Sequence, residues 1–154
     1  MGFIFLLAGC RKKEELDACK LVNEADAQAI IDRPIKFDQA MTDKVRSLDH
    51  SPGVCIYSAG PDETSPRVVV GYRLYDSLDL IKEGFTESKT SVWKTQNQEP
   101  LLTIGDDAVL LDGSLIALRK GKVWLQIGVA NAGEHDTISK EALKSAAQKA
   151  TKMF

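Results

Sequence analysis

The sequence predicts an α+β fold, in which an antiparallel β-sheet carries about three packed helices in a single domain. Segments follow one another in the order helix, strands, helix, strands, helix, and their connections are too short for most parallel crossovers. The 154 residues are 44% hydrophobic and 27% charged, with a net charge of -2. This composition is ordinary for one globular domain with one hydrophobic core.

The first helix is predicted in the segment that starts at Leu21. Asn23 is suited to cap its N-terminus, and three apolar residues recur on one face of the segment. Pro34 ends this helix, because the residue before a proline avoids the helical conformation. Residues 35–50 stay ambiguous, since their apolar residues have helical spacing whereas the polar residues between them suit a loop equally well.

A β-hairpin is predicted next. Residues 54–57 are short, β-branched and aromatic, and residues 67–75 alternate between two faces. A helix over residues 78–88 follows, capped by Asp76 or Ser77 and carrying apolar residues at spacings of three and four.

Three consecutive antiparallel strands are predicted over residues 108–111, 114–119 and 122–129. Asp112-Gly113 between the first two is a strong hairpin signal, and Lys120-Gly121 separates the last two. Residues 89–105 are less regular, with Trp93 isolated among polar residues. The chain is expected to end in a helix capped near Thr137 or Ser139.

The N-terminus carries a different signal. Leu7-Ala8-Gly9-Cys10 follows an apolar run and resembles the lipobox of bacterial lipoproteins. The resemblance implies cleavage before Cys10, acylation of its thiol and of the new N-terminus, and anchoring in a membrane of the cell envelope. No Lys or Arg precedes Cys10, so the leader is expected to be truncated. The expected organisation is a signal peptide at 1–9, a lipidated cysteine and tether at 10–17, and a globular domain at 18–154.

Arg11 after the lipidated cysteine resembles the pattern that sorts lipoproteins to the outer membrane, which implies the periplasmic face of that membrane where the organism has two. The membrane is thus the first expected partner. Nucleic acid is not expected, because the chain has no basic excess.

The three cysteines fit an envelope protein. With Cys10 lipidated, Cys19 and Cys55 are left to pair in an oxidising compartment. The alternative, a metal site, lacks a Cys-x-x-Cys motif and has only two separate histidines, His50 and His135. We therefore predict a disulfide and no metal.

Several short features together resemble a group of small, largely uncharacterised bacterial envelope lipoproteins. They are the lipid cysteine, Cys19 at the opening of the domain, a capped helix ending near proline, the Cys55-x-Tyr57 strand, the Ile104-Gly105-Asp106-Asp107-Ala108 segment and the Arg119-Lys120-Gly121 turn. Such domains resemble the α/β sandwich of the Mog1/PsbP type. The resemblance implies a fold and a location, and no established activity.

Catalytic signatures are missing from the sequence. It contains no Gly-x-Ser-x-Gly, P-loop or Gly-x-Gly-x-x-Gly motif. Asp106 and Asp107 are adjacent, which favours turn capping over calcium binding. His50 and His135 are interpreted as loop histidines. We therefore expect no cofactor and no enzymatic activity.

One face of the predicted sheet has the character of a binding surface. Trp124, Gln126, Arg73 and Tyr75 lie on strand faces opposite the clearest apolar rows, where an aromatic ring beside polar groups suits a partner or small ligand. The alternative is that a helix covers this face and Trp124 belongs to the core.

The leading hypothesis is a lipid-anchored, non-enzymatic envelope domain that binds a protein partner or a small ligand. A hydrolase-like enzyme using His50 with a nearby acid is one alternative. An immunity or inhibitor lipoprotein is another.

Overall fold

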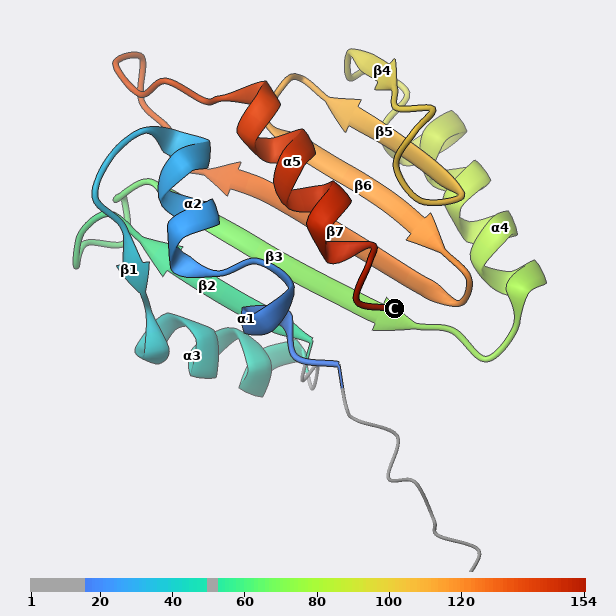
Figure 1. Cartoon of the computed structure of the whole chain (residues 1–154), viewed down its shortest axis with the longest axis horizontal. Helices are drawn as coiled ribbons and strands as arrows, with labels where there is room; N and C mark the ends of the chain where they lie inside the picture. Colours follow the sequence, from blue (N-terminus) through green and yellow to red (C-terminus); the bar gives the residue numbers. More distant parts are fainter. Residues whose placement is uncertain (1–15, 50–52) are drawn as a thin grey trace, which may run out of the picture.

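The computed structural model describes residues 16–49 and 53–154. Within them, one domain contains a seven-stranded antiparallel sheet in the order β1-β2-β3-β7-β6-β5-β4, with five α-helices (Figure 1). The α+β class is confirmed. The expectation of about three helices was too low, and two short strands were not predicted.

The strands are β1 (Lys36–Phe37), β2 (Val54–Ser58), β3 (Arg67–Leu74), β4 (Gln98–Pro100), β5 (Asp107–Leu111), β6 (Leu115–Lys120) and β7 (Val123–Ala130). The helices are α1 (Ala18–Leu21), α2 (Glu24–Ile31), α3 (Gln39–Asp49), α4 (Leu78–Glu87) and α5 (Lys140–Ala150), and the π-helical turn η1 (Ser88–Val92) continues α4. None of the helices in the described ranges is both long enough and apolar enough to cross a membrane.

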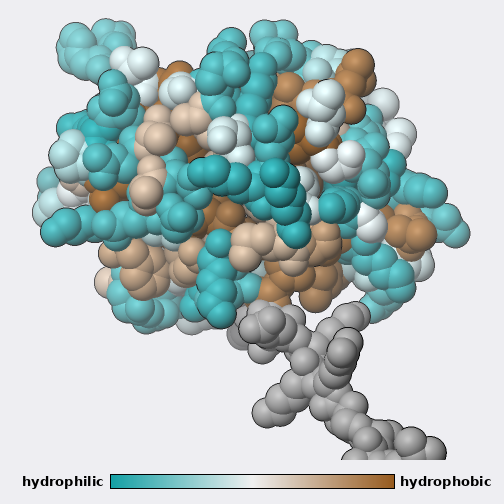
Figure 2. Space-filling model, in the orientation of Figure 1, coloured by the Kyte–Doolittle hydropathy of each residue, from teal (hydrophilic) through white to brown (hydrophobic). Residues whose placement is uncertain are grey.

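Strand alternation divides the hydrophobic residues between the two faces of the sheet. On one face, Leu125 and Ile127 of β7 belong to a large core beneath α1, α2 and α5 (Figure 1). The outer surface on this side is mainly hydrophilic, with scattered apolar patches (Figure 2). On the other face, Phe85 of α4 and Trp93 pack on Val109, Leu111 and Ala117 in a second, smaller cluster. Trp93, isolated in the sequence, is thus buried by distant residues.

The N-terminal helices are fastened to β2 by two kinds of contact. The predicted disulfide joins Cys19 of α1 to Cys55 of β2, with Cα atoms 5.1 Å apart. Beside it, the buried Tyr57 hydroxyl lies 2.5 Å from the Val22 carbonyl oxygen and 3.2 Å from that of Cys19. A covalent bond and a buried hydrogen bond therefore hold the same corner of the domain.

Alkaline pH is expected to loosen this corner. Burial, followed by the nearby carboxylates of Asp17, Glu24 and Asp26, raises the pKa of Tyr57 from 10.0 to about 12. The unfolded chain loses this proton at a lower pH than the folded protein, so the stability that Tyr57 contributes is complete below pH 10.0 and is lost as the pH rises toward 12.

Chemical denaturation across this range measures the effect. Tyr57→Phe is expected to reduce the alkaline loss of stability, whereas Tyr75→Phe, which removes a half-buried phenol elsewhere, is expected to leave it unchanged. Equal pH profiles for the wild type and Tyr57→Phe would contradict this assignment.

Most of the segment 35–50, which was ambiguous in the sequence, forms α3, and this helix lies along the edge of β2. An Asp38 carboxylate oxygen accepts a hydrogen bond from the Met41 N–H at 2.9 Å at the start of the helix. Its other oxygen accepts one from Ser58, and these bonds hold the pKa of Asp38 below its usual value. Thr42 accepts the Ile56 N–H at 3.0 Å, and Arg46 donates to the Val54 carbonyl at 2.9 Å. Side chains of α3 thereby complete a strand edge that β1 is too short to cover.

Candidate ligand-binding site

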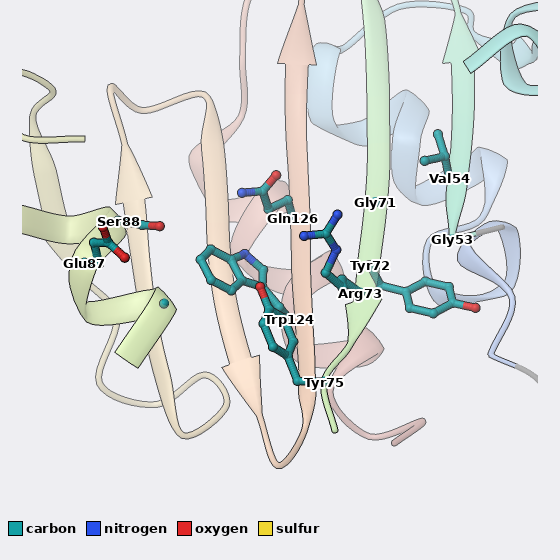
Figure 3. Close-up of a pocket in the computed structure, with 11 residues that line it drawn as sticks. Gly53, Val54, Gly71, Tyr72, Arg73, Tyr75, Glu87, Ser88, Trp124 and Gln126 are labelled. Atoms are coloured by element: carbon teal, nitrogen blue, oxygen red, sulfur yellow. The ribbon is translucent and has the colours of Figure 1, made fainter. Parts of the chain in front are cut away.

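The sheet face that carries the smaller cluster is hollowed beside α4. The register places Trp124 opposite Arg73, and Gln126 opposite Gly71, on neighbouring strands β7 and β3. Because residues two apart share a face, these four positions form one floor. Figure 3 shows Trp124, Gln126 and Arg73 projecting on the same side of the sheet.

The hollow has a volume of about 460 Å³ and is open to solvent. Glu87 and Ser88, where α4 continues into η1, form one wall, Val54 lies on the opposite side, and Tyr75 lies beside Trp124 (Figure 3). We call this feature, bounded by the floor and these walls, the Trp124 hollow. It contains all four residues of the predicted binding face.

Glycine at position 71 keeps the floor open. A Cβ atom added at Gly71 would meet a single neighbour within 4 Å, the Gly53 carbonyl oxygen at 3.9 Å. The backbone of Gly71 does not have a positive φ, so its conformation suits any residue. Gly71 therefore matters because it leaves the floor of the hollow unfilled, and not because its backbone conformation requires a glycine.

Trp124 is half-buried, so it is neither a fully covered core residue nor a freely exposed one. Its ring centroid lies 5.1 Å from that of Phe85, in an edge-to-face arrangement. Tyr75 lies nearly parallel to it, with 6.0 Å between centroids and 18° between planes. On α4, a Cβ atom at Gly84 would stand 3.6 Å from the indole, so the helix approaches closely. These contacts fix the orientation of the ring at the edge of the hollow.

Polar side chains around the hollow have unused hydrogen-bonding capacity. Within residues 16–49 and 53–154, the side chains of Arg73, Gln126 and Glu87 make no hydrogen bond or ion pair, and the Trp124 indole N–H makes none either. Elsewhere on this face, by contrast, Lys89 pairs with a carboxylate at 2.7 Å. The hollow thus combines three donors on its floor with one carboxylate on its wall.

The other residues that the sequence offered as candidates for metal binding or catalysis do not line this hollow in the described part of the chain. Asp106 accepts a hydrogen bond from the Gly121 N–H at 2.7 Å, and Asp107 forms the ion pair with Lys89. His135 is exposed in the loop before α5. Over the part of the chain that the structure describes, no three His, Cys, Asp or Glu side chains are grouped as a metal site requires. Cys10 and His50 lie outside the described residues.

Sequence reasoning did not identify the wall formed by Glu87 and Ser88. The pattern of apolar residues that predicts a helix does not show which turn of that helix will lie beside an uncovered part of the sheet. Gly71 did leave a signal, because a lone glycine in a strand often marks a place that must stay open. Gly84 left no such signal, because its role in the close approach of α4 depends on its distance from Trp124, which the sequence does not show.

Comparison with protein-family models, with curated protein sequences and with solved structures finds no match for this chain.

Proposed function

We propose that this protein is a lipid-anchored domain of the bacterial cell envelope that binds a small polar ligand in the Trp124 hollow, without enzymatic activity. One observation carries the proposal: four residues selected from strand alternation alone lie around a single hollow. A volume of about 460 Å³ falls within the usual range for small-molecule sites, about 300–1,000 Å³. A ligand of this size would use the free polar groups there.

The position of the hollow agrees with the proposed anchor. The Tyr72 hydroxyl donates to the Leu16 carbonyl oxygen, so the chain enters the domain beside the end of β3 that carries Arg73 and precedes Tyr75. Five residues lie between Cys10 and Leu16, and the six residue-to-residue steps limit the tether to about 20 Å. An anchor at Cys10 would therefore keep the hollow near the membrane surface.

Cys10→Ala is expected to move the protein from the membrane fraction to the soluble fraction of its host cell, because the only acylated thiol in the proposal is removed. Quantitative immunoblotting of fractionated envelopes measures this change. Lys12→Ala, which leaves the lipobox intact, serves as the control. Unchanged membrane association of Cys10→Ala would remove the lipoprotein assignment.

Gly71→Val is expected to abolish ligand binding without loss of stability. The added side chain would occupy the floor of the hollow, and a β-branched residue suits a strand better than glycine does. Native mass spectrometry of the protein isolated from its own cells is expected to show a non-covalent adduct on the wild type that falls at least about tenfold in the variant.

Gly133→Val provides a matched control, since its Cβ atom would stand 3.5 Å from the Asp136 carboxylate, an ordinary contact, in a loop outside the hollow. Equal adduct levels on the wild type, Gly71→Val and Gly133→Val would place the ligand elsewhere. A wild-type protein that carries no adduct would contradict stable binding of a small ligand.

A further inference from the structure

We infer that the ligand of the Trp124 hollow is a neutral, polyhydroxylated ring, that is, a saccharide unit; this inference rests on the proposed function of the hollow as a binding site. The charges around the hollow, its aromatic rings and the pairing of its backbone groups all favour such a ligand.

The charges favour a neutral ligand that both donates and accepts hydrogen bonds. Arg73 and Gln126 offer donors on the floor, whereas Glu87 on the wall only accepts, and none of the three is satisfied within the described residues. An anion would be attracted by Arg73 but repelled by Glu87. A cation would be attracted by Glu87 but repelled by Arg73. Each hydroxyl of a sugar is a donor and an acceptor, so one neutral ring can satisfy both the donors on the floor and the carboxylate on the wall.

The aromatic side chains supply the complementary apolar surface. Tyr75 is stacked on Trp124, with 6.0 Å between centroids and 18° between planes, so the half-buried Tyr75 ring turns its outer face away from the indole at the edge of the hollow. The faces of aromatic rings are electron-rich, and the C–H groups on the flat side of a pyranose carry slight positive charge. A sugar ring can therefore rest on this surface while its equatorial hydroxyls reach the polar side chains.

The backbone of the floor argues against an extended peptide. Gly71 pairs with Val54 on one side and Gln126 on the other, and Trp124 pairs with Arg73 and Arg119. These segments are interior to the sheet, so they offer no open strand edge for β-augmentation. Recognition must come from side chains, which suits a compact hydroxylated ring better than a peptide main chain.

Nuclear magnetic resonance titration of the full chain in detergent micelles tests the inference. Chitotriose, maltotriose and cellotriose represent neutral saccharides, trialanine a zwitterion and inorganic phosphate an anion. At least one trisaccharide is expected to shift the Trp124 indole N–H and Gly71 amide signals, with a Kd of about 1 mM. Binding is expected to be insensitive to ionic strength, because the ligand is neutral.

Two variants separate a saccharide, which uses both charged groups, from an anion, which would lose affinity with Arg73→Gln but not with Glu87→Gln. Arg73→Gln and Glu87→Gln are each expected to weaken trisaccharide binding by about tenfold, since each removes hydrogen bonds to a charged group. Arg33→Gln and Glu83→Gln, which lie outside the hollow, are expected to leave it unchanged. Thermal unfolding of each variant shows whether the domain remains folded.

The outcomes distinguish this inference from the proposed function. Selective binding of trialanine or phosphate at the same signals would overturn the saccharide and retain the hollow as a binding site. Failure of every probe would also overturn the saccharide, and the adduct comparison between Gly71→Val and Gly133→Val would then decide on the hollow itself.

Discussion

Phe85→Ala is expected to lower the free energy of unfolding by about 3–5 kcal/mol, the usual range for truncating a buried aromatic residue. Phe85 is 0% exposed and is the largest fully buried side chain on the α4 side of the sheet. Its ring contacts Trp93 at 5.7 Å and Trp124 at 5.1 Å between centroids. Its loss would leave a cavity beneath α4, and denaturant unfolding measures the cost.

Leu80→Ala on the same helix is the matched control, because Leu80 is 54% exposed and its truncation is expected to change stability by no more than about 0.5 kcal/mol. Similar losses for the two variants would mean that α4 is not held to the sheet by Phe85. Ligand binding should weaken with Phe85→Ala, since the same contacts position the Glu87 wall of the hollow.

Reduction of the Cys19–Cys55 disulfide is expected to lower the free energy of unfolding by about 2–4 kcal/mol. The bond closes a loop over a sequence separation of 36, so breaking it gives the unfolded chain more conformational freedom. Denaturation curves with and without reductant measure the difference.

The double variant Cys19→Ala, Cys55→Ala is expected to be less stable than the oxidised wild type and to show no further response to reductant. Stability of the wild type that is unaffected by a reductant shown to break the bond would contradict a stabilising role. Tyr57→Phe in the double variant would then show how much of this corner depends on the buried hydroxyl.

The central strands were predictable because their information is local. The alternation in residues 67–75 and 122–129 sets which side chains share a face, and Asp112-Gly113 marks a hairpin within a few residues. The disulfide was predicted by combining cysteine parity with the resemblance at Cys10. Each of these inferences required only the order of residues along the chain.

Other elements depend on partners that are distant in the sequence. Thr42 and Arg46 are unremarkable polar residues until β2 supplies the backbone groups with which they hydrogen-bond. Within five residues of Trp93 on either side, Val92 is the one apolar residue and it is exposed, yet Phe85 and the strands bury Trp93. Sequence periodicity does not report such contacts, so α3 stayed ambiguous and the role of Trp93 was missed.

One part of the candidate site could likewise be predicted from local sequence, and another part could not. Its floor follows from strand alternation, which placed Trp124, Gln126 and Arg73 on one side. Its wall depends on how far α4 extends across the sheet and how closely Gly84 approaches the indole. A helix shifted by one turn would give the same sequence pattern with a different wall.

Photocrosslinking in intact cell envelopes shows whether the Trp124 hollow binds a ligand in its native setting. Benzoylphenylalanine would replace Ser88 on the wall of the hollow or, as the control, the exposed Ser145 on α5. We expect a specific adduct from position 88 that is absent from position 145 and is lost with Gly71→Val. Identical adducts from the two positions, or an adduct at position 88 that persists with Gly71→Val, would contradict it.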